Sequence, residues 1–256
     1  MEKINYIGAY YLYSKEVRRF LKVYNQTLFI PVVTSLLFMA VFNLALGQRV
    51  HSIGDLAFGQ FIAPGLIMMS VMQNAFANTS SSLIMGKVLG TIIDYLTPPL
   101  SAMEVTFSMV MAGVTRGIMV GVLVFISVLF FVRLEVPHIG YAIFFLFSAS
   151  LLLSLFGMFG GIISETFDQM AAVNSYIIVP MSFLSGTFYS VESLPGFWHQ
   201  ISQFNPFFYM IDGFRYGMTG HHDGNLTTGI YMMIATNLIM WAIVQTMLYK
   251  GYRIKS

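Results

Sequence analysis

Six long apolar stretches dominate this chain and constrain its fold more strongly than any other feature. They run approximately over Leu28–Leu46, Phe61–Ser81, Met103–Val132, Ile139–Ile163, Val173–Ser190 and Gly229–Tyr249. A helix crosses the hydrocarbon layer of a membrane in about 20 residues, which is close to the length of each stretch. Only 9% of the residues are charged, against about 25% in soluble domains, so a soluble core could not hide this much apolar surface. The sequence therefore predicts an all-α integral membrane protein with six transmembrane helices.

Two of the six stretches are weaker than the others. The second carries Gln73, Asn74 and Asn78 in its later half, and the fifth is short and contains Pro180. If one span is lost, we expect it to be one of these two. The residues between the stretches are too few for a second soluble domain, so one membrane domain over 1–256 is expected. Its expected parts are an amphipathic interface helix at 1–27, spans 1 to 5 at 28–190, an outer re-entrant loop at 191–226, and the sixth span with a basic tail at 227–256.

The distribution of lysine and arginine predicts the orientation. Of the 13 such residues, nine lie in the N-terminal segment, in the link between spans two and three, and in the tail. Three lie in links on the other side, and Arg116 lies inside a span. Cytoplasmic links are enriched in lysine and arginine. Both termini are therefore predicted to face the cytoplasm, which requires an even number of spans.

The segment before the first span is amphipathic. At helical spacing, apolar residues share one face: Tyr13, Val17, Phe20, Leu21 and Tyr24. Basic residues share the opposite face: Lys15, Arg18, Arg19 and Lys22. Such a helix suits the membrane interface, where cations meet anionic lipid. It is either a topology anchor alone or a helix that also touches a cytoplasmic partner, and the residues leave both open.

The link between the second and third stretches is unusually apolar. It contains Val88, Leu89, Ile92, Ile93, Tyr95 and Leu96 and ends at Pro98 and Pro99. A double proline stops a helix, so a short helix is expected before it. Its apolar residues need a cover, which is the protein's own helices, the lipid surface or a second protein.

The third stretch carries a packing pattern and a costly charge. Gly113, Gly117 and Gly121 repeat every fourth residue, which lets a neighbouring helix approach closely. Arg116 lies beside them near mid-span, where an arginine must pair or meet water. We interpret this face as a packing surface and Arg116 as an interior site, paired structurally or lining a pathway.

The segment at 191–226 is too long for a turn and too broken for a span. Pro195 and Pro206 interrupt a run of large apolar residues, so two short helices are expected to dip back into the outer leaflet. Such a hairpin either seals the bundle or forms an outer gate. The residues expected to matter in it are Trp198, Asn205, Pro206, Tyr209 and Arg215.

Catalytic signatures are absent from the sequence. It has no G-x-x-x-x-G-K-[ST] loop, no H-E-x-x-H, no G-x-S-x-G and no cysteine. No metal site is expected either, since the adjacent His221, His222 and Asp223 rarely converge on one ion without help. The span cores contain essentially no acid, which weakens a proton-coupled carrier but leaves sodium coupling open.

Three segments together resemble a known family. They are GTIIDYLTP from Gly90 to Pro98, FIAPGL from Phe61 to Leu66, and NPFFYMIDGFRYG from Asn205 to Gly217. Over nearly the whole chain the sequence resembles the permease subunits of ABC-2-type transporters, specifically a bacterial inner-membrane group of this length. Asp94 stands where many members carry Glu, and Pro99 where a branched residue is common.

The resemblance implies the permease subunit of an ATP-driven exporter that forms a homodimer and docks a separate ATP-binding subunit. It implies that ATP and Mg bind that partner and that this chain is not an enzyme and holds no cofactor. It assigns coupling to Gly86, Lys87, Gly90, Thr91, Asp94, Leu96 and Pro98. The family exports polysaccharides, lipid-linked molecules, drugs or metals, and the lack of charge clusters in the spans favours an amphiphilic or neutral cargo.

Two other classes compete with this interpretation. A self-contained secondary transporter or channel predicts inverted repeats or matching broken helices, and neither is clear in the sequence. An intramembrane enzyme needs a nucleophile, base or metal ligands at one depth, and none is found.

Overall fold

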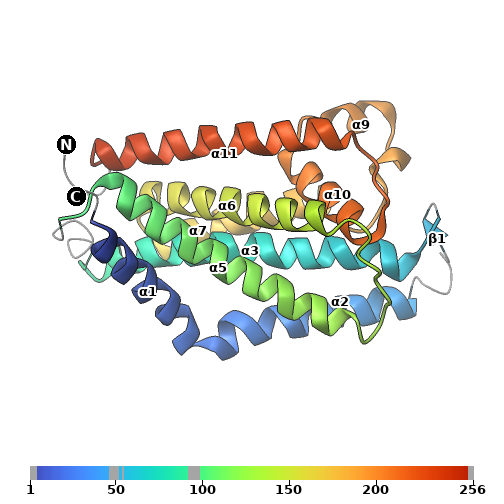
Figure 1. The fold of residues 1–256 in the computed structure, drawn as a ribbon, viewed down its shortest axis with the longest axis horizontal. Coiled ribbons are helices and arrows are strands. Elements are labelled where there is room, and N and C mark those ends of the chain that lie inside the picture. Colours follow the sequence, from blue (N-terminus) through green and yellow to red (C-terminus); the bar gives the residue numbers. More distant parts are fainter. Residues whose placement is uncertain (1–4, 46–51, 54, 92–98, 253–256) are drawn as a thin grey trace.

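The computed structural model describes residues 5–45, 52–53, 55–91 and 99–252 as a bundle of helices (Figure 1). The first half contains α1 (Tyr6–Lys22), the π-helical turn η1 (Asn25–Phe29), α2 (Ile30–Ala45), β1 (Ser52–Ile53), β2 (Leu56–Ala57), α3 (Phe58–Val88) and α5 (Ala102–Val128). The second half contains α6 (Ile139–Ile163), α7 (Phe167–Val173), the π-helical turn η2 (Asn174–Ile178), α8 (Val179–Leu184), the 3₁₀ turn η3 (Val191–Ser193), α9 (Gly196–Ser202), α10 (Pro206–Thr219) and α11 (Leu226–Tyr249).

The long helices α2, α3, α5, α6 and α11 run along the long axis of the molecule (Figure 1). The start of α1 and the end of α11 lie at the same end, which we call the terminal end. The β1–β2 ribbon, α9 and α10 lie at the opposite end, which we call the far end. In the ribbon, Ser52 lies opposite Ala57 and Ile53 opposite Leu56 in an antiparallel register.

Four segments are long and apolar enough to cross a membrane: Asn25–Phe42, Ala102–Val128, Ile139–Ile163 and Leu226–Tyr249. The other two predicted spans correspond to α3 and to the α7–η2–α8 run, which are the two that the sequence marked as weaker. Helix α3 extends beyond the predicted 61–81 in both directions, and the α7–η2–α8 run lies earlier than the predicted 173–190. The count of six spans stays a prediction.

Both π-helical turns precede a proline. Pro31 follows η1, and Pro180 follows η2 at the start of α8. Proline donates no backbone hydrogen bond and its ring crowds the carbonyl four residues earlier, so the preceding turn widens. At η1 the Thr27 hydroxyl also donates to the Phe20 carbonyl at 2.8 Å. The chain therefore bends between α1 and α2 instead of continuing as one helix (Figure 1).

Helix α5 begins with a capping box directly after the double proline. The Ser101 hydroxyl accepts a hydrogen bond from the Glu104 backbone N–H at 3.3 Å, and Glu104 accepts one from the Ser101 N–H at 2.6 Å. This reciprocal pairing satisfies two donors at the helix start. The Glu104 carboxylate also accepts a hydrogen bond from the Asn5 N–H, which joins the start of α1 to the start of α5.

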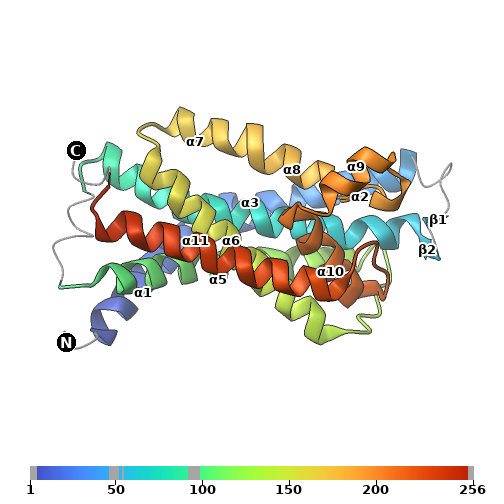
Figure 2. The same cartoon turned by 90° about the horizontal axis from the view of Figure 1, so that it is seen from above.

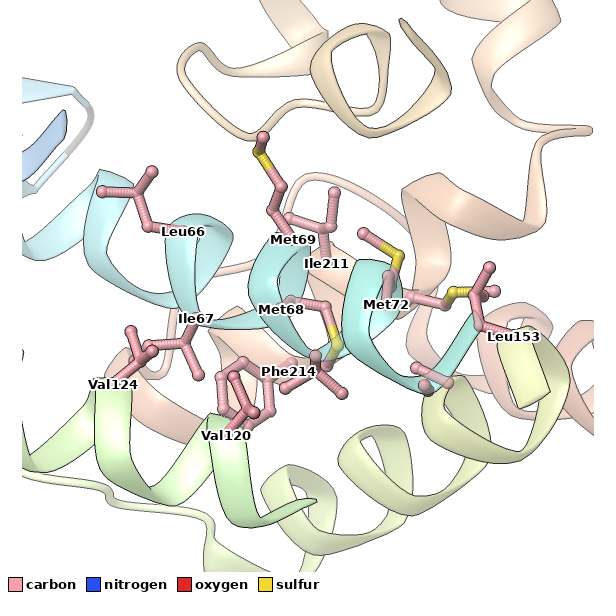
Figure 3. Close-up of a cluster of buried hydrophobic side chains, with 14 of the residues drawn as sticks. Leu66, Ile67, Met68, Met69, Met72, Val120, Val124, Leu153, Ile211 and Phe214 are labelled. Atoms are coloured by element: carbon pink, nitrogen blue, oxygen red, sulfur yellow. The ribbon is translucent and has the colours of Figure 1, made fainter. Parts of the chain in front are cut away.

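The core of the bundle is built around α3. Its Leu66, Ile67, Met68, Met69 and Met72 meet side chains of three other helices (Figure 3). The partners labelled there are Val120 and Val124 of α5, Leu153 of α6, and Ile211 and Phe214 of α10. Because neighbouring helices enclose α3, it tolerates the polar residues that made it the least apolar stretch.

Candidate functional site

A buried polar cluster crosses the middle of the bundle. Arg116 of α5 is 9% exposed, and its Nη2 donates a hydrogen bond to the Asn74 Oδ1 of α3 at 2.9 Å. The Asn74 Nδ2 donates to the Ser70 carbonyl at 2.9 Å, which fixes the amide orientation. The Arg116 Nε is buried and has no hydrogen-bond partner in the part of the chain that the structure describes. The interior arginine thus pairs with an amide and not with an acid.

Arg19 of α1 joins the same cluster one helical turn further along α3, at Asn78. Its Nε lies 3.0 Å from Glu16 Oε2, and its Nη2 donates to the Asn78 carbonyl at 2.7 Å. Its Nη1 donates to the Ser81 hydroxyl at 3.3 Å. Glu16 is 1% exposed, so this ion pair is shielded from solvent on its acidic side. We refer to Glu16, Arg19, Asn74, Asn78 and Arg116 as the mid-bundle cluster.

The position of Arg19 corrects one expectation from the sequence. We expected Arg19 to share the outward face with Lys15, Arg18 and Lys22, which are exposed. That expectation is wrong for Arg19, because α1 packs obliquely along α5 and turns this residue toward α3. Two bonds hold α1 there: Tyr13 Oη and Thr115 Oγ1 are 2.9 Å apart, and the Ser108 hydroxyl donates to the Ala9 carbonyl at 2.9 Å.

The glycine face of α5 is used for packing inside the chain. A Cβ on Gly113 would collide with the Ser154 hydroxyl of α6. A Cβ on Gly117 would meet Ser150 Oγ and Ala75 Cβ at 3.0 and 3.1 Å, and one on Gly121 would meet Val71 at 2.7 Å. These glycines let α5 approach α6 and α3 closely, as small residues do in membrane bundles.

A groove lies along α3 between α2 and the α7–η2 segment. Its volume is about 440 Å³, within the range typical of ligand pockets. Figure 2 shows α7 running beside α3 on the side away from α11. Amides and hydroxyls line the groove together with aromatic, aliphatic and methionine side chains, and none of the described residues that line it is ionisable.

At the terminal end, the last turn of α3 is anchored by its Lys87. Its Nζ donates to the Ile162 carbonyl and, at 3.0 Å, to the Ser164 carbonyl. These carbonyls lie at the C-terminus of α6, where a cation also meets the negative end of the helix dipole. Gly86 is buried in α3, and Gly90, with φ of +70°, and Thr91 form the turn that follows. Asp94, Leu96 and Pro98, also expected to couple to a partner, lie outside the described residues.

At the far end, Arg215 of α10 is fully buried. Its Nε donates to the Phe61 carbonyl of α3 at 3.2 Å, and its Nη2 donates to the Gly186 carbonyl after α8. The guanidinium carbon lies 3.9 Å from the centre of the Phe61 ring, and Nη1 lies 3.9 Å from Asp212 Oδ1. One side chain therefore ties α10 to α3 and to the end of α8.

Two acids extend this far-end cluster into the loop before α11. Asp212 accepts hydrogen bonds from the N–H groups of Asp223 and Gly224 at 2.8 and 2.9 Å. Asp223 accepts the Val191 N–H at 2.8 Å and lies 3.0 Å from His221 Nε2. We refer to Asp212, Arg215, His221 and Asp223 as the far-end cluster. In the described ranges, no three His, Cys, Asp or Glu residues lie close enough to hold a metal.

The other residues of the 191–226 segment that the sequence singled out are not members of the far-end cluster. Asn205 caps α10 by accepting the Phe207 N–H at 3.0 Å and donates to the Ser185 hydroxyl at 2.9 Å. Pro206 occupies the first turn of α10, and Tyr209 is buried against Gly229 of α11. Trp198 on α9 is 54% exposed. The segment thus contains α9 and α10, the two helices expected there; whether they dip into the membrane stays a prediction.

Comparisons with known proteins place these features in a family. The family model described as "ABC-2 type transporter" matches residues 9–219. The chain belongs to the ABC-2 type transporter family. It is 36% identical over 249 residues to the "Inner membrane transport permease YadH" of Escherichia coli K12, covering 96% of this chain and 97% of that protein. The protein of the same name from Shigella flexneri matches with the same values.

This membership confirms the resemblance drawn from the three sequence segments. The chain is the membrane subunit of an ABC transporter and a multi-pass inner-membrane protein. Membership in this permease family implies an ATP-binding partner subunit. Sequence reasoning singled out Arg19, Arg116 and Arg215 but missed their respective partners Glu16, Asn74 and Asp212. The i,i+3 spacing of Glu16 with Arg19 and of Asp212 with Arg215 is a local signal that could have found those two pairs, whereas Asn74 and Arg116 lie on different helices and no spacing connects them.

Proposed function

We propose that this chain is the permease of an ATP-driven exporter that works as a homodimer with a separate ATP-binding subunit. The cargo is an amphiphilic, lipid-linked, polysaccharide or drug-like molecule. Both termini face the cytoplasm, six helices span the inner membrane, and α9 with α10 forms a re-entrant hairpin at the outer face. ATP and Mg bind the partner subunit, and this chain carries out no catalysis.

The anchoring of Lys87 carries the proposal. A partner pressing on residues 86–91 acts on α3, which ends there, and on α6, whose last carbonyls Lys87 holds. These two helices pack tightly along their length, since a Cβ on Gly161 would meet Leu83 at 2.9 Å. A movement at this link would therefore reach the centre of the bundle. Coupling also requires the partner to bind the two permease states with different affinity.

The orientation is supported by the positions of the chain ends. The start of α1 and the end of α11 lie at the terminal end together with the Lys87 link. Lys87, in the last turn of α3, and Lys250, the C-cap of α11, also belong to helix ends at this end of the bundle. Under the positive-inside rule this end faces the cytoplasm, where the ATP-binding subunit resides.

The first test is to extract the tagged chain from native membranes in mild detergent and identify what copurifies at equal stoichiometry. We expect a subunit that carries a phosphate-binding loop. A chain that comes out alone, even after gentle crosslinking, would contradict the proposal and favour a self-contained secondary transporter or channel.

The second test separates coupling from assembly. We expect Asp94→Arg to leave membrane insertion intact while ATP hydrolysis no longer drives export. Asp55→Arg is the matched control, because Asp55 is an exposed acid in the β1–β2 turn at the opposite end. Normal export by the Asp94→Arg variant would remove the coupling role from this link.

A further inference from the structure

A second groove lies at the terminal end, between α6 and α11, and we call it the α6–α11 groove. The two helices pack side by side (Figure 2), and the groove between them has a volume of about 580 Å³. Its walls are formed by residues of both helices: Phe159, Ile163, Ala242, Ile243, Thr246 and Met247. The Thr246 hydroxyl donates to the Ala242 carbonyl of its own helix at 2.7 Å. The walls therefore present an apolar surface to whatever lies between them.

A lysine stands at the terminal end of this groove. Lys250 is the C-cap of α11, and among the described residues it is the one charged residue of the lining. Its side chain is exposed, and its ammonium makes no hydrogen bond or ion pair with any residue in the described ranges. Two further cations, Arg253 and Lys255, follow within five positions in the sequence. The apolar groove thus ends in a free positive charge.

The end of α11 does not need this ammonium as a cap. Gly251 has φ of +64°, and its N–H donates to the carbonyl three residues earlier at 3.0 Å. The Tyr252 N–H donates to the Met247 carbonyl at 3.0 Å. These two bonds form a Schellman motif, which satisfies the last carbonyls of a helix with backbone donors. At the end of α3, in contrast, the Lys87 ammonium is bound to two carbonyls at the end of α6, so Lys250 differs from Lys87 in being free for a ligand.

The position of the groove matches one leaflet of a bilayer. At 1.5 Å per residue, α11 rises about 12 Å from Ala242 to Lys250, which is roughly half of the hydrocarbon thickness of about 30 Å. Because we propose that the terminal end faces the cytoplasm, the groove opens to the cytoplasmic leaflet, whose surface carries anionic lipid. Its lining changes from apolar to cationic toward that surface. A phospholipid has the same order, with an acyl chain in the core and a phosphate at the interface.

A comparable groove between the starts of α1 and α5 has the opposite charge. Its volume is about 490 Å³, and Tyr6, Tyr10, Tyr13 and Phe107 contribute aromatic surface to it. Among the described residues that line it, the one ionisable group besides the tyrosines is Glu104. A phosphate at that position would meet a carboxylate, and like charges repel. Charge therefore distinguishes the α6–α11 groove as the site suited to an anionic lipid.

We propose that the α6–α11 groove binds an anionic phospholipid of the cytoplasmic leaflet. One acyl chain lies between α6 and α11, and the Lys250 ammonium pairs with the phosphate of the headgroup. Tyr252 lines the same end of the groove, at the level where tyrosine rings meet lipid headgroups. This inference goes beyond the proposed exporter function and takes from it only the orientation of the bundle.

The test compares two lipids with the same acyl chains and different headgroups. The full-length chain is delipidated in detergent and titrated with dioleoylphosphatidylglycerol or dioleoylphosphatidylcholine, while native mass spectrometry counts bound lipid and Tm is recorded. We expect saturable binding of phosphatidylglycerol with a rise in Tm of about 5 °C, and weaker binding of phosphatidylcholine. Equal affinity for the two lipids would overturn the anionic headgroup. An equal rise in Tm with inorganic phosphate alone would overturn the lipid.

A charge variant locates the headgroup. We expect Lys250→Gln to weaken the binding of phosphatidylglycerol about fivefold, which is the contribution of one basic residue near an anionic membrane surface, and to leave phosphatidylcholine binding unchanged. Arg133→Gln is the matched control, because Arg133 is an exposed cation at the far end. Wild-type affinity for phosphatidylglycerol in the Lys250→Gln variant would overturn the pairing of Lys250 with the phosphate.

A volume variant locates the acyl chain. We expect Ala242→Phe to weaken the binding of both lipids, because the added ring occupies the groove, while folding is retained because Ala242 is exposed. Ala235→Phe is the matched control, because Ala235 is an exposed alanine of the same helix outside the groove lining. Equal lipid binding by the two variants would overturn the groove as the site. Loss of the oligomer in Ala242→Phe with unchanged lipid binding would assign the groove to a second copy of the chain instead.

Failure of this inference is distinguishable from failure of the exporter proposal. The lipid titration needs no ATP-binding subunit, and the copurification needs no added lipid. An ATP-binding subunit that copurifies with a chain whose lipid binding is insensitive to Lys250→Gln would leave the exporter intact and remove only the lipid site.

Discussion

The two buried polar clusters of this protein use arginine in different ways. In the far-end cluster, Arg215 lies among two acids and two backbone carbonyls, which belong to α10 itself, the first turn of α3, and the loops after α8 and before α11. In the mid-bundle cluster, Arg19 pairs with Glu16 and also bonds Asn78 and Ser81 of α3, while Arg116 bonds only the Asn74 amide. The first arrangement fixes loops to a helix, whereas the second leaves polar groups unpaired beside an open groove.

This difference predicts that disrupting the far-end cluster and disrupting the mid-bundle cluster affect stability and transport to different degrees. Breaking a buried pair by removing one partner costs about 3–5 kcal/mol, because a charge is left uncompensated. The far-end cluster contains two such pairs, Arg215 with Asp212 and His221 with Asp223, and its other bonds join these side chains to backbone groups. Each cluster contains a buried guanidinium nitrogen without a hydrogen-bond partner among the described residues, Arg116 Nε in the mid-bundle cluster and Arg215 Nη1 in the far-end cluster, but Arg116 also has no acidic partner there, whereas Arg215 Nη1 lies 3.9 Å from Asp212. We therefore expect the far-end cluster to dominate stability and the mid-bundle cluster to affect transport more than folding.

The largest effect is expected from Arg215→Leu. The substitution strands Asp212 and the Phe61 and Gly186 carbonyls in a buried site, so the free energy of unfolding should fall by about 3–5 kcal/mol. Thermal unfolding in nanodiscs measures the loss. Arg133→Leu is the control, because Arg133 is exposed at the same end. Equal stability of the two variants would show that the far-end cluster does not hold the loops.

How much of each cluster the sequence predicts depends on how far apart along the chain the contacting residues lie. Local patterns identified the long helices, the packing face with Gly117, and Arg116 as an interior residue. The partner of Arg116 is Asn74, 42 positions away, and only the packing of α5 on α3 brings the two together. Arg19 was misplaced for the same reason, since helical periodicity assigns a face but not the neighbour that covers it. The segment from Asn205 to Gly217 was singled out by its resemblance to a family. The bonds from Arg215 to the Phe61 and Gly186 carbonyls, however, join segments that no spacing rule connects.

The next effect in size tests the spacing that holds the mid-bundle cluster together. We expect Gly117→Leu to force α5 away from Ser150 of α6 and Ala75 of α3, at a cost of about 1–3 kcal/mol. The shift should also weaken assembly with other subunits, measured by size-exclusion chromatography with light scattering. Gly140→Leu is the control, because a Cβ at Gly140 meets nothing within 4 Å. An unchanged oligomer with unchanged Tm in the Gly117→Leu variant would refute this packing role.

A smaller effect on stability is expected from Arg116→Met. The substitution leaves the Asn74 oxygen without its donor, which costs about 1–3 kcal/mol, but it also removes a buried donor that has no partner. The net loss of stability should therefore lie at the lower end of this range and well below that of Arg215→Leu. Transport in proteoliposomes should fall more than Tm does, because Asn74 loses its fixed orientation in the groove wall. If Arg116→Met lowered stability and transport in equal proportion, the mid-bundle cluster would have the same stabilising role as the far-end cluster, and the contrast between them would be lost.

The smallest effect is a pH dependence confined to the far-end cluster. The hydrogen bond to Asp223 raises the pKa of His221 above its ordinary value, against the opposing effects of burial and of Arg215, while Asp212 adds to the rise. Burial alone would raise the pKa of Asp223, but its bond to His221 and the charge of Arg215 outweigh it and lower that pKa. A raised histidine pKa contributes stability below its ordinary value of 6.5, and the contribution disappears as pH rises through the folded-state value. A lowered aspartate pKa contributes above 3.8 and is lost as pH falls through its folded-state value.

The two contributions overlap between the ordinary pKa values of the two groups, so the pair should stabilise the far end most at about pH 5–6. We expect Tm to fall between pH 6 and pH 8 by an amount equivalent to about 1 kcal/mol or less, given that His221 is partly exposed. His221→Gln should remove this fall, whereas His222→Gln, at an exposed neighbouring position with no contact to Asp223 in the described structure, should retain it. An identical pH profile in both variants would assign the dependence to groups outside the far-end cluster. Because the mid-bundle cluster contains no histidine, the same measurement also tests whether the two clusters respond independently.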